Sequence, residues 1–193
     1  MNIAVSGEKP NRTITICRTS RSADETQPWN GILFALSARD IGKYSNRLCD
    51  LYSNGSEIMG TDGIRLHLVQ SNVIPEGAYR LLSKGKDLIA LEEQDEKAPK
   101  YDFIVNPFSF GRTQITLPVC TEGRRISAAL AVIDRNISDK YAVNVNYLQD
   151  ALRLDCIWLA YLSKEDKVSI ILKTKDDEAI QATVVIMPFP LED

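Results

Sequence analysis

The sequence contains few of the residues from which catalytic and metal sites are usually built. Its 193 residues include one histidine, His67, and four cysteines, at positions 17, 49, 120 and 156. The cysteines are far apart and form no Cys-x-x-Cys pair, so neither a zinc site nor a redox motif is indicated. We expect them to be small buried thiols in a reducing compartment.

Long apolar runs and glycine-rich loops are also missing. No apolar stretch reaches the roughly 20 residues that a membrane-spanning helix needs, and residues 1–8 lack the basic start and apolar core of a secretion signal. We therefore expect a cytoplasmic protein with no membrane partner. Sequence neighbours assemble no Ser-His-Asp, Cys-His or phosphate-loop arrangement, so we predict no catalytic residue, no metal and no cofactor.

Neither sign of charge dominates the chain. It has 23 Lys and Arg residues against 26 Asp and Glu residues, with a formal net charge of −3 and a pI near 5.3. This balance argues against a protein that grips nucleic acid with a dense basic surface. A ring that encloses DNA needs only a locally positive lining. The length allows one large domain or two small ones, each with a hydrophobic core.

Alternation of apolar and polar residues predicts a chain dominated by strands. The first strand is expected at residues 13–17 and a buried apolar strand at residues 32–36. Further strands are expected at residues 57–59, 65–69, 79–82, 88–91, 103–105, 114–117, 127–133, 157–162, 168–173 and 182–187.

Two helices are predicted between these strands. Ser37-Ala38-Arg39-Asp40 has the pattern of a capping box, which would begin a helix that ends at Asn54-Gly55. Its apolar side would consist of Ile41, Tyr44, Leu48 and Leu51. The second helix would begin after Asn144 and bury Leu148, Ala151 and Leu152.

The two helix starts resemble each other, which predicts an internal duplication. Tyr141-Ala142-Val143-Asn144 matches Phe34-Ala35-Leu36-Ser37 as aromatic, alanine, aliphatic and cap. The predicted fold class is α+β, with a duplicated strand-helix-strands unit and two helices packed on an antiparallel sheet. Residues 1–30 would be an extension or the first strands, and residues 31–193 one domain with a long insertion at about 92–138. The alternative is two small domains, at residues 1–92 and 100–193.

Three segments resemble the beta subunit of bacterial DNA polymerase III, the sliding clamp. Residues 144–152 are similar to a family helix written Asn-Val-x-Tyr-Leu-x-Asp-Ala-Leu, and Val185-Ile186-Met187-Pro188-Phe189-Pro190-Leu191 to the terminal Val-x-Met-Pro-Met-x-Leu. Thr61-Asp62-Gly63-Ile64-Arg65-Leu66 is similar to Thr-Asp-Gly-His-Arg-Leu. The resemblance implies a clamp-like fold and a non-enzymatic accessory or processivity role in DNA replication.

In this family the second and third segments form an apolar pocket that accepts short peptide motifs of replication partners. Flexible Met and rigid Pro, Phe and Leu suit such a surface. The alternative, that the terminal segment only completes a core strand, stays open. The resemblance implies these pocket residues: Thr61, Gly63, Ile64, Arg65, Leu66, Val185, Met187, Pro188, Phe189 and Leu191.

The helices of clamps line a central hole, which implies double-stranded DNA and further copies of the chain as additional partners. The DNA-lining residues would be Arg39, Lys43, Arg47 and Arg153. Phosphate contacts require only such point charges. A solvated helix face would show the same pattern, so the sequence leaves both interpretations open.

Two features depart from the family. Residues 24–34 also look like the clamp segment Asp-Glu-Thr-Arg-Pro-x-Leu-Asn-Gly-Val-Leu-Phe, which follows a helix in the family but here would lead into one. The two pocket segments also lie much closer in sequence than in a three-domain clamp, which suggests a shortened or fused relative. Two other classes remain open: a small cytoplasmic enzyme with an unrecognised active site, and a structural or adaptor protein of a phage or mobile element.

Overall fold

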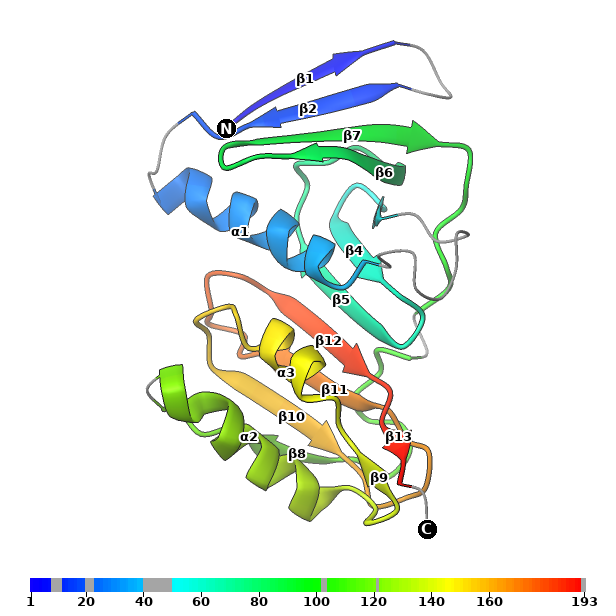
Figure 1. Cartoon of the computed structure of the whole chain (residues 1–193), viewed down its shortest axis with the longest axis vertical. Coiled ribbons are helices and arrows are strands. Elements are labelled where there is room, and N and C mark those ends of the chain that lie inside the picture. Colours follow the sequence, from blue (N-terminus) through cyan, green and yellow to red (C-terminus); the bar gives the residue numbers. More distant parts are fainter. Residues whose placement is uncertain (8–11, 20–22, 40–49, 102–103, 121, 192–193) are drawn as a thin grey trace. The chain divides into compact units, whose positions relative to one another are not determined.

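A computed structural model describes residues 1–7, 12–19, 23–39, 50–101, 104–120 and 122–191 (Figure 1). The chain divides into two compact units. The first comprises Met1–Gly63 and Leu68–Pro99, and the second comprises Ile64–His67 and Lys100–Asp193. Both combine helices with antiparallel strands, so the predicted α+β class is confirmed. The described residues form three helices, one more than the sequence predicted.

In the described residues of the first unit, one helix, α1 (Ala23–Ser37), packs against β4 of a sheet. Ile14 and Ile16 on β2 and Ile89 and Leu91 on β7 are fully buried, as strand alternation requires. The strand predicted at residues 13–17 is confirmed. In sheet order the strands are β1 (Asn2–Ser6), β2 (Thr13–Cys17), β7 (Leu88–Gln94), β6 (Gly77–Lys84), β3 (Leu51–Ser53), β4 (Glu57–Thr61) and β5 (Arg65–Gln70).

The buried strand predicted at residues 32–36 is wrong, because this segment is the second half of α1. Trp29, Ile32 and Leu36 are each at most 2% exposed and recur at helical spacing. A short apolar run alone cannot distinguish a buried strand from a buried helix face. Ser37 therefore lies at the end of α1, and its hydroxyl donates to the Phe34 carbonyl at 2.7 Å.

The helix predicted to follow Ser37 falls largely on residues 40–49, which lie outside the described residues. Its last apolar position, Leu51, is in strand β3, and Asn54-Gly55 forms the turn between β3 and β4. The Asn54 side chain accepts hydrogen bonds from the Ser56 and Glu57 amides, at 2.9 and 2.7 Å. Gly55 has a φ of 85°. It therefore adopts the predicted left-handed conformation, but in a hairpin turn rather than at the end of a helix.

The second unit places two helices, α2 (Glu122–Asn136) and α3 (Val145–Ala151), beside its sheet. Asn144 caps α3 by accepting from the Asn146 amide, which confirms the predicted second helix. The predicted match between residues 34–37 and 141–144 does not extend to secondary structure, because Phe34–Ser37 belong to α1 whereas Tyr141–Ala142 form β9. The sheet order is β12 (Ala182–Ile186), β11 (Ile170–Thr174), β10 (Trp158–Leu162) and β8 (Thr113–Thr116), while β13 (Phe189–Pro190) pairs with β9 (Tyr141–Ala142).

The strand predicted at residues 127–133 is also wrong, because these residues belong to α2. Ala129 and Ile133, four residues apart, are buried, whereas Ser127, Ala131 and Asp134 are exposed. This is helical rather than strand alternation. The segment is also rich in alanine, which favours a helix.

Candidate functional site

The second unit brings two distant segments of the sequence together. The segment Ile64–His67, which includes the start of β5, lies beside β12. The Met187 amide donates to the Ile64 carbonyl at 2.9 Å. Thr61-Asp62-Gly63 therefore leads directly to Ile64, the residue that contacts the terminal segment at Met187.

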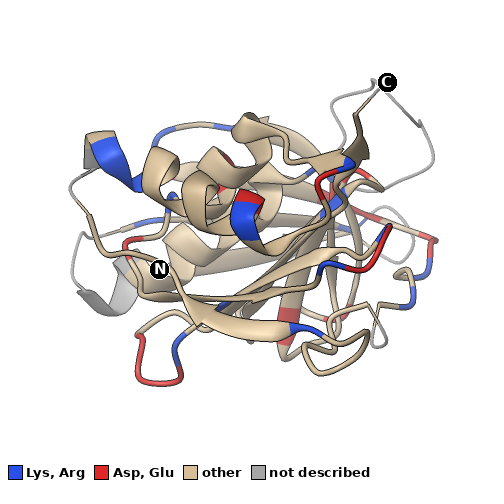
Figure 2. Ribbon diagram, turned by 90° about the horizontal axis from the view of Figure 1, so that it is seen from below, with Lys and Arg blue, Asp and Glu red and all other residues tan. Residues whose placement is uncertain are grey.

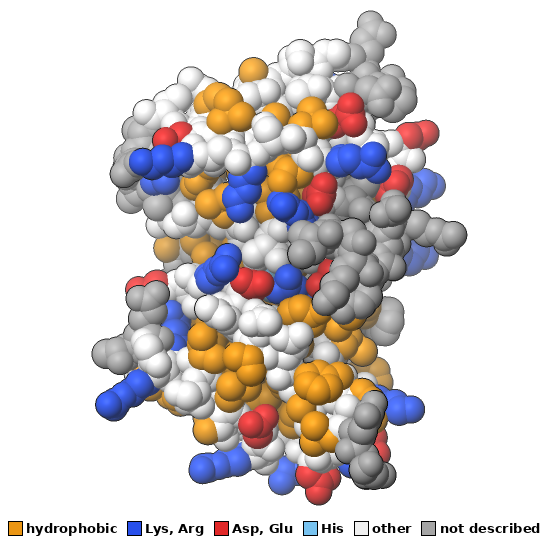
Figure 3. Space-filling view, in the orientation of Figure 1, with side chains coloured by type: hydrophobic (Ala, Val, Ile, Leu, Met, Phe, Trp, Pro, Cys, Tyr) orange, Lys and Arg blue, Asp and Glu red, His pale blue; other side chains and the backbone are white. Residues whose placement is uncertain are grey.

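The chain beyond β12 exposes three apolar side chains. Met187, Phe189 and Leu191 are 42%, 46% and 51% exposed. Their alternate spacing places them on one side of an extended segment, and we term them the tail patch. Figure 3 shows hydrophobic side chains gathered in its lower half, over the region of α3, β9 and β13. Val185 and Leu66, two further predicted pocket residues, are 2% and 8% exposed and therefore buried. Their part in a peptide pocket stays a prediction.

Backbone pairing holds the tail patch in place. Phe189 and Pro190 pair with Ala142 and Tyr141, and the Leu191 amide donates to the Lys140 carbonyl at 2.8 Å. An apolar patch on a fixed segment loses less conformational entropy on binding than one on a free tail.

The loop that anchors the tail patch is itself braced by an ion pair. The Lys140 ammonium lies 3.0 Å from Asp166, and the Ser138 hydroxyl donates to the same carboxylate at 2.8 Å. The hydrogen bonds from Lys140 and Ser138 lower the pKa of Asp166, and the hydrogen bond to Asp166 raises the pKa of Lys140. Both groups are therefore charged at neutral pH.

Arg65 joins the Ile64–His67 segment to α3. Its guanidinium donates to Asp150 at 2.6 Å and lies 4.4 Å from the centre of the Tyr147 ring. Asp150 also pairs with Arg153 at 3.2 Å. The Arg65 side chain is only 10% exposed. Its role is therefore to position the neighbouring backbone rather than to present a charge to a ligand. The sequence prediction omitted Tyr147 and Asp150 from the pocket, although both belong to the helix motif.

Thr61 and Gly63, the other predicted pocket residues, belong to the first unit. The Thr61 hydroxyl accepts from the Gly63 amide at 3.1 Å, and Gly63 has a φ of 87°. This backbone conformation explains the glycine, because a side chain would strain it. The part of these two residues in a peptide pocket stays a prediction, as does the half-buried Pro188.

The predicted DNA-lining residues are distributed over both units. Arg39 lies 3.7 Å from Asp50 in the first unit, and Arg153 is on the second. Lys43 and Arg47 lie outside the described residues. Figure 2 shows acidic and basic residues interspersed over the described ribbon. Arg124 and Arg135, which are exposed on α2, are not among the predicted residues, because the sequence predicted a strand for the middle of this helix. The DNA-lining assignment stays a prediction.

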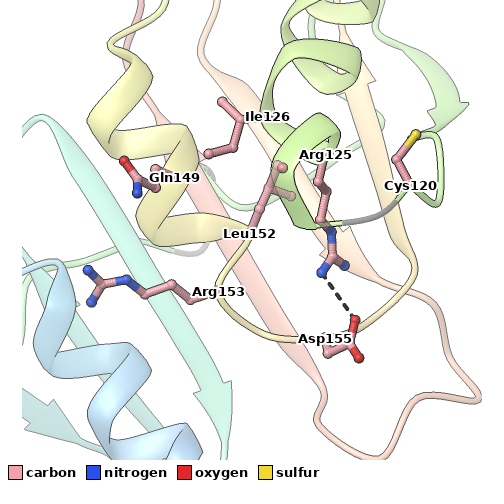
Figure 4. A pocket seen from close by; sticks show the side chains of 8 residues that line it. Cys120, Arg125, Ile126, Gln149, Leu152, Arg153 and Asp155 are labelled. Carbon is pink, nitrogen blue, oxygen red and sulfur yellow. Dashed lines mark hydrogen bonds and ion pairs between the residues drawn. The ribbon is translucent and has the colours of Figure 1, made fainter.

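A separate cleft of about 880 Å³ lies between α2 and α3 (Figure 4). Arg125 donates to Asp155 at 3.2 Å and to the Cys156 carbonyl at 2.5 Å. Ile126 and Leu152 lie between the helices. None of the tail-patch residues borders this cleft, which is lined by Cys120, Gly123, Arg125, Ile126, Gln149, Leu152, Arg153 and Asp155.

Cys156, whose carbonyl accepts from Arg125 beside this cleft, is poorly suited to nucleophilic catalysis. Burial, and then the neighbouring Glu178, raise the pKa of the Cys156 thiol to about 11. The thiol is therefore protonated at neutral pH and a weak nucleophile. His67 is fully buried in β5. Within the described residues, no group of three or more His, Cys, Asp or Glu side chains is placed to hold a metal ion.

Two further observations concern membranes and sequence relatives. In the described part of the chain, no helix is both long enough and apolar enough to cross a membrane. No protein-family model matches the sequence, and no curated protein matches it.

Comparison with solved structures identifies the fold as that of a sliding clamp. The DNA polymerase sliding clamp of Pseudomonas aeruginosa matches at a TM-score of 0.53 and 15% identity, over 98% of this chain and 76% of that one. DNA polymerase III subunit beta of Borrelia burgdorferi matches at a TM-score of 0.56 and 13% identity, over 97% of this chain and 65% of that one. The Helicobacter pylori beta clamp, bound to a DNA ligase peptide, matches at a TM-score of 0.50 and 12% identity, over 98% of this chain and 76% of that one. At these identities the likeness concerns the fold.

Proposed function

We propose that this chain is a non-enzymatic, clamp-like accessory protein of DNA replication that binds short peptide motifs at the tail patch. The observation that carries the proposal is the hydrogen bond between Met187 and Ile64, beside three exposed apolar side chains on a fixed segment. The Helicobacter pylori clamp bound to a DNA ligase peptide supports extending peptide binding to a chain of this fold. Its partners would be replication proteins that carry such motifs.

The chemistry of the patch indicates which peptides would bind. Met187 can adapt its shape, whereas the Phe189 ring is rigid, a combination that accommodates aliphatic and aromatic anchors. Ile64 stands where the family has histidine, which removes a polar group from this edge. We therefore propose a ligand with two apolar residues near its end, such as Gln-Leu-Ser-Leu-Phe.

We also propose that copies of the chain associate through sheet edges, and that double-stranded DNA is a second partner. Two strands occupy outer positions in the sheet order, β1 in the first unit and β8 in the second. Neither strand contains a charged residue or proline, the features that usually protect edges from pairing. One copy would join the next head to tail, since the two edges differ.

Peptide binding is tested by fluorescence anisotropy with a labelled Gln-Leu-Ser-Leu-Phe peptide. We expect Met187→Ala to weaken binding about tenfold, the usual effect of removing an apolar anchor from an interface. Val119→Ala is the control, because Val119 is 76% exposed in the same unit but outside the patch. Leu66→Ala is less suitable, because Leu66 is buried and its loss also affects folding. Equal affinity of the native chain, Met187→Ala and Val119→Ala would refute the proposal.

A further inference from the structure

The loop at residues 106–112, before β8, is closed by a single guanidinium. Arg112 Nη1 donates to the Asn106 carbonyl at 3.1 Å, and to the carbonyl and hydroxyl of Ser109 at 2.9 and 2.8 Å. Its Nε and Nη2 donate to the carbonyl and hydroxyl of Ser169, at 3.2 and 2.9 Å. The Arg112 side chain thus braces the loop and ties it to the chain before β11. Within the loop, the Asn106 side chain also accepts from the Phe108 amide at 3.0 Å.

This loop holds an unfavourable backbone conformation. Phe110 has a φ of 61°, followed by Gly111 at 59°. A left-handed conformation at a residue other than glycine costs about 1–2 kcal/mol. The Arg112 hydrogen bonds help to offset this cost and so favour this conformation of the loop. Rigid loops that display aromatic side chains make effective anchors in interfaces, because little entropy is lost on docking.

Two phenylalanines extend from the loop into solvent. Phe108 is 81% exposed and Phe110 is 54% exposed. The Phe108 ring meets Tyr161 edge-on at 6.0 Å, and Arg112 lies 5.3 Å from the centre of the Phe110 ring. Each ring is therefore supported on one side and hydrated on the other. Such exposed aromatic residues are typical of contact surfaces.

The position of the loop indicates its partner. Residue 112 leads directly into β8, the outer strand of the second unit's sheet, and β1 is the outer strand of the first. Ile3 and Val5 on β1 are 38% and 49% exposed and lie on one face of the strand. No acidic or nucleic-acid partner is indicated, because Arg112, the loop's only cation, is engaged by five hydrogen bonds.

From these observations we infer that residues 106–112 form an aromatic anchor by which one copy of the chain docks on another. Phe108 and Phe110 of the first copy would cover Ile3 and Val5 of the second, while β8 pairs with β1. The five-residue β1 and four-residue β8 are matched in length. The inference rests on the proposed association through sheet edges and adds the side chains that determine its affinity.

Sedimentation velocity of the full chain at a series of micromolar concentrations tests this inference. The loop variant combines Phe108→Ser with Phe110→Asn, because asparagine tolerates a positive φ. The edge variant is Ile3→Lys, and Val119→Ser is the control for loss of an exposed apolar side chain. We expect the loop and edge variants each to weaken association about tenfold or more, while Val119→Ser associates like the native chain.

Mixing the two weakened variants gives the sharper result. In a head-to-tail interface, the loop variant retains an intact β1 and the edge variant retains an intact loop. The mixture should therefore form pairs but nothing larger, at concentrations at which each variant alone is monomeric. If the native chain is monomeric throughout, both the edge association and the anchor are overturned. If it associates and the loop variant associates equally well, or mixing restores no pairs, only the anchor is overturned.

Discussion

Replacing Gly60 with alanine is expected to destabilise the first unit strongly. A Cβ atom at residue 60 would lie 1.9 Å from the Ala35 carbonyl oxygen and 2.7 Å from its carbon. Both are backbone atoms of α1, so relief would require the helix to move away from β4. We expect a loss of about 3 kcal/mol or more, which corresponds to a melting temperature lower by about 10 °C.

Thermal unfolding followed by circular dichroism measures this effect, and Gly123→Ala is the matched control. A Cβ at Gly123 would meet no atom within 4 Å. Alanine also has the higher helix propensity, so the control should be as stable as the native chain or up to about 1 kcal/mol more stable. Equal melting temperatures of the Gly60→Ala and native chains would contradict the packing of α1 on β4.

Removing the carboxylate of Asp150 is expected to destabilise the second unit and to weaken the peptide site with it. Asp150→Ala leaves the Arg65 guanidinium, 10% exposed, without its 2.6 Å carboxylate. Loss of one member of a largely buried ion pair costs about 3 kcal/mol. Because Arg65 adjoins Ile64, whose carbonyl accepts from Met187, we also expect weaker binding of the Gln-Leu-Ser-Leu-Phe peptide.

An exposed ion pair in the same unit provides the comparison. Lys175 and Asp177 lie 3.2 Å apart, but their side chains are 50% and 69% exposed. Exposed pairs are screened by solvent and contribute little. Asp177→Ala should therefore leave the melting temperature and peptide affinity nearly unchanged. Equal effects of Asp150→Ala and Asp177→Ala would show that the Arg65 pair has no special structural role.

The tail patch and the aromatic loop serve different proposed partners, although both belong to the second unit. Met187→Ala should weaken peptide binding without changing association of the chain. The Phe108 and Phe110 substitutions should weaken association of the chain without changing peptide binding. This separation follows because the tail patch and residues 106–112 have no residue in common.

Strands with regular alternation could be predicted closely from the sequence. Residues 13–17 match β2 at both ends because Ile14 and Ile16 alternate with half-buried neighbours. Residues 32–36 and 127–133 could not, because their apolar content fits a strand or a helix face equally well. In α1 the helical spacing is revealed only when Trp29 is included, and in α2 it is revealed by Ala129 and Ile133.

The candidate site was less accessible to sequence reasoning. The resemblance to sliding clamps, rather than periodicity, suggested that the segments around Ile64 and Met187 meet. The contact between Arg65 and Asp150 joins residues 85 positions apart, and no local pattern predicts such a pair. The aromatic loop was missed for a similar reason, because Arg112 ties it to Ser169, 57 positions away in the sequence.

The peptide site is tested most directly by titrating isotope-labelled protein with the unlabelled Gln-Leu-Ser-Leu-Phe peptide and following backbone amide resonances. We predict that the largest shifts occur at Ile64, Arg65 and Leu66 and at the amides of Met187, Phe189 and Leu191, with saturation as the peptide concentration rises. Saturable shifts confined to the α2–α3 cleft, at Arg125, Gln149 and Arg153, would contradict the account, as would the absence of any saturable shift.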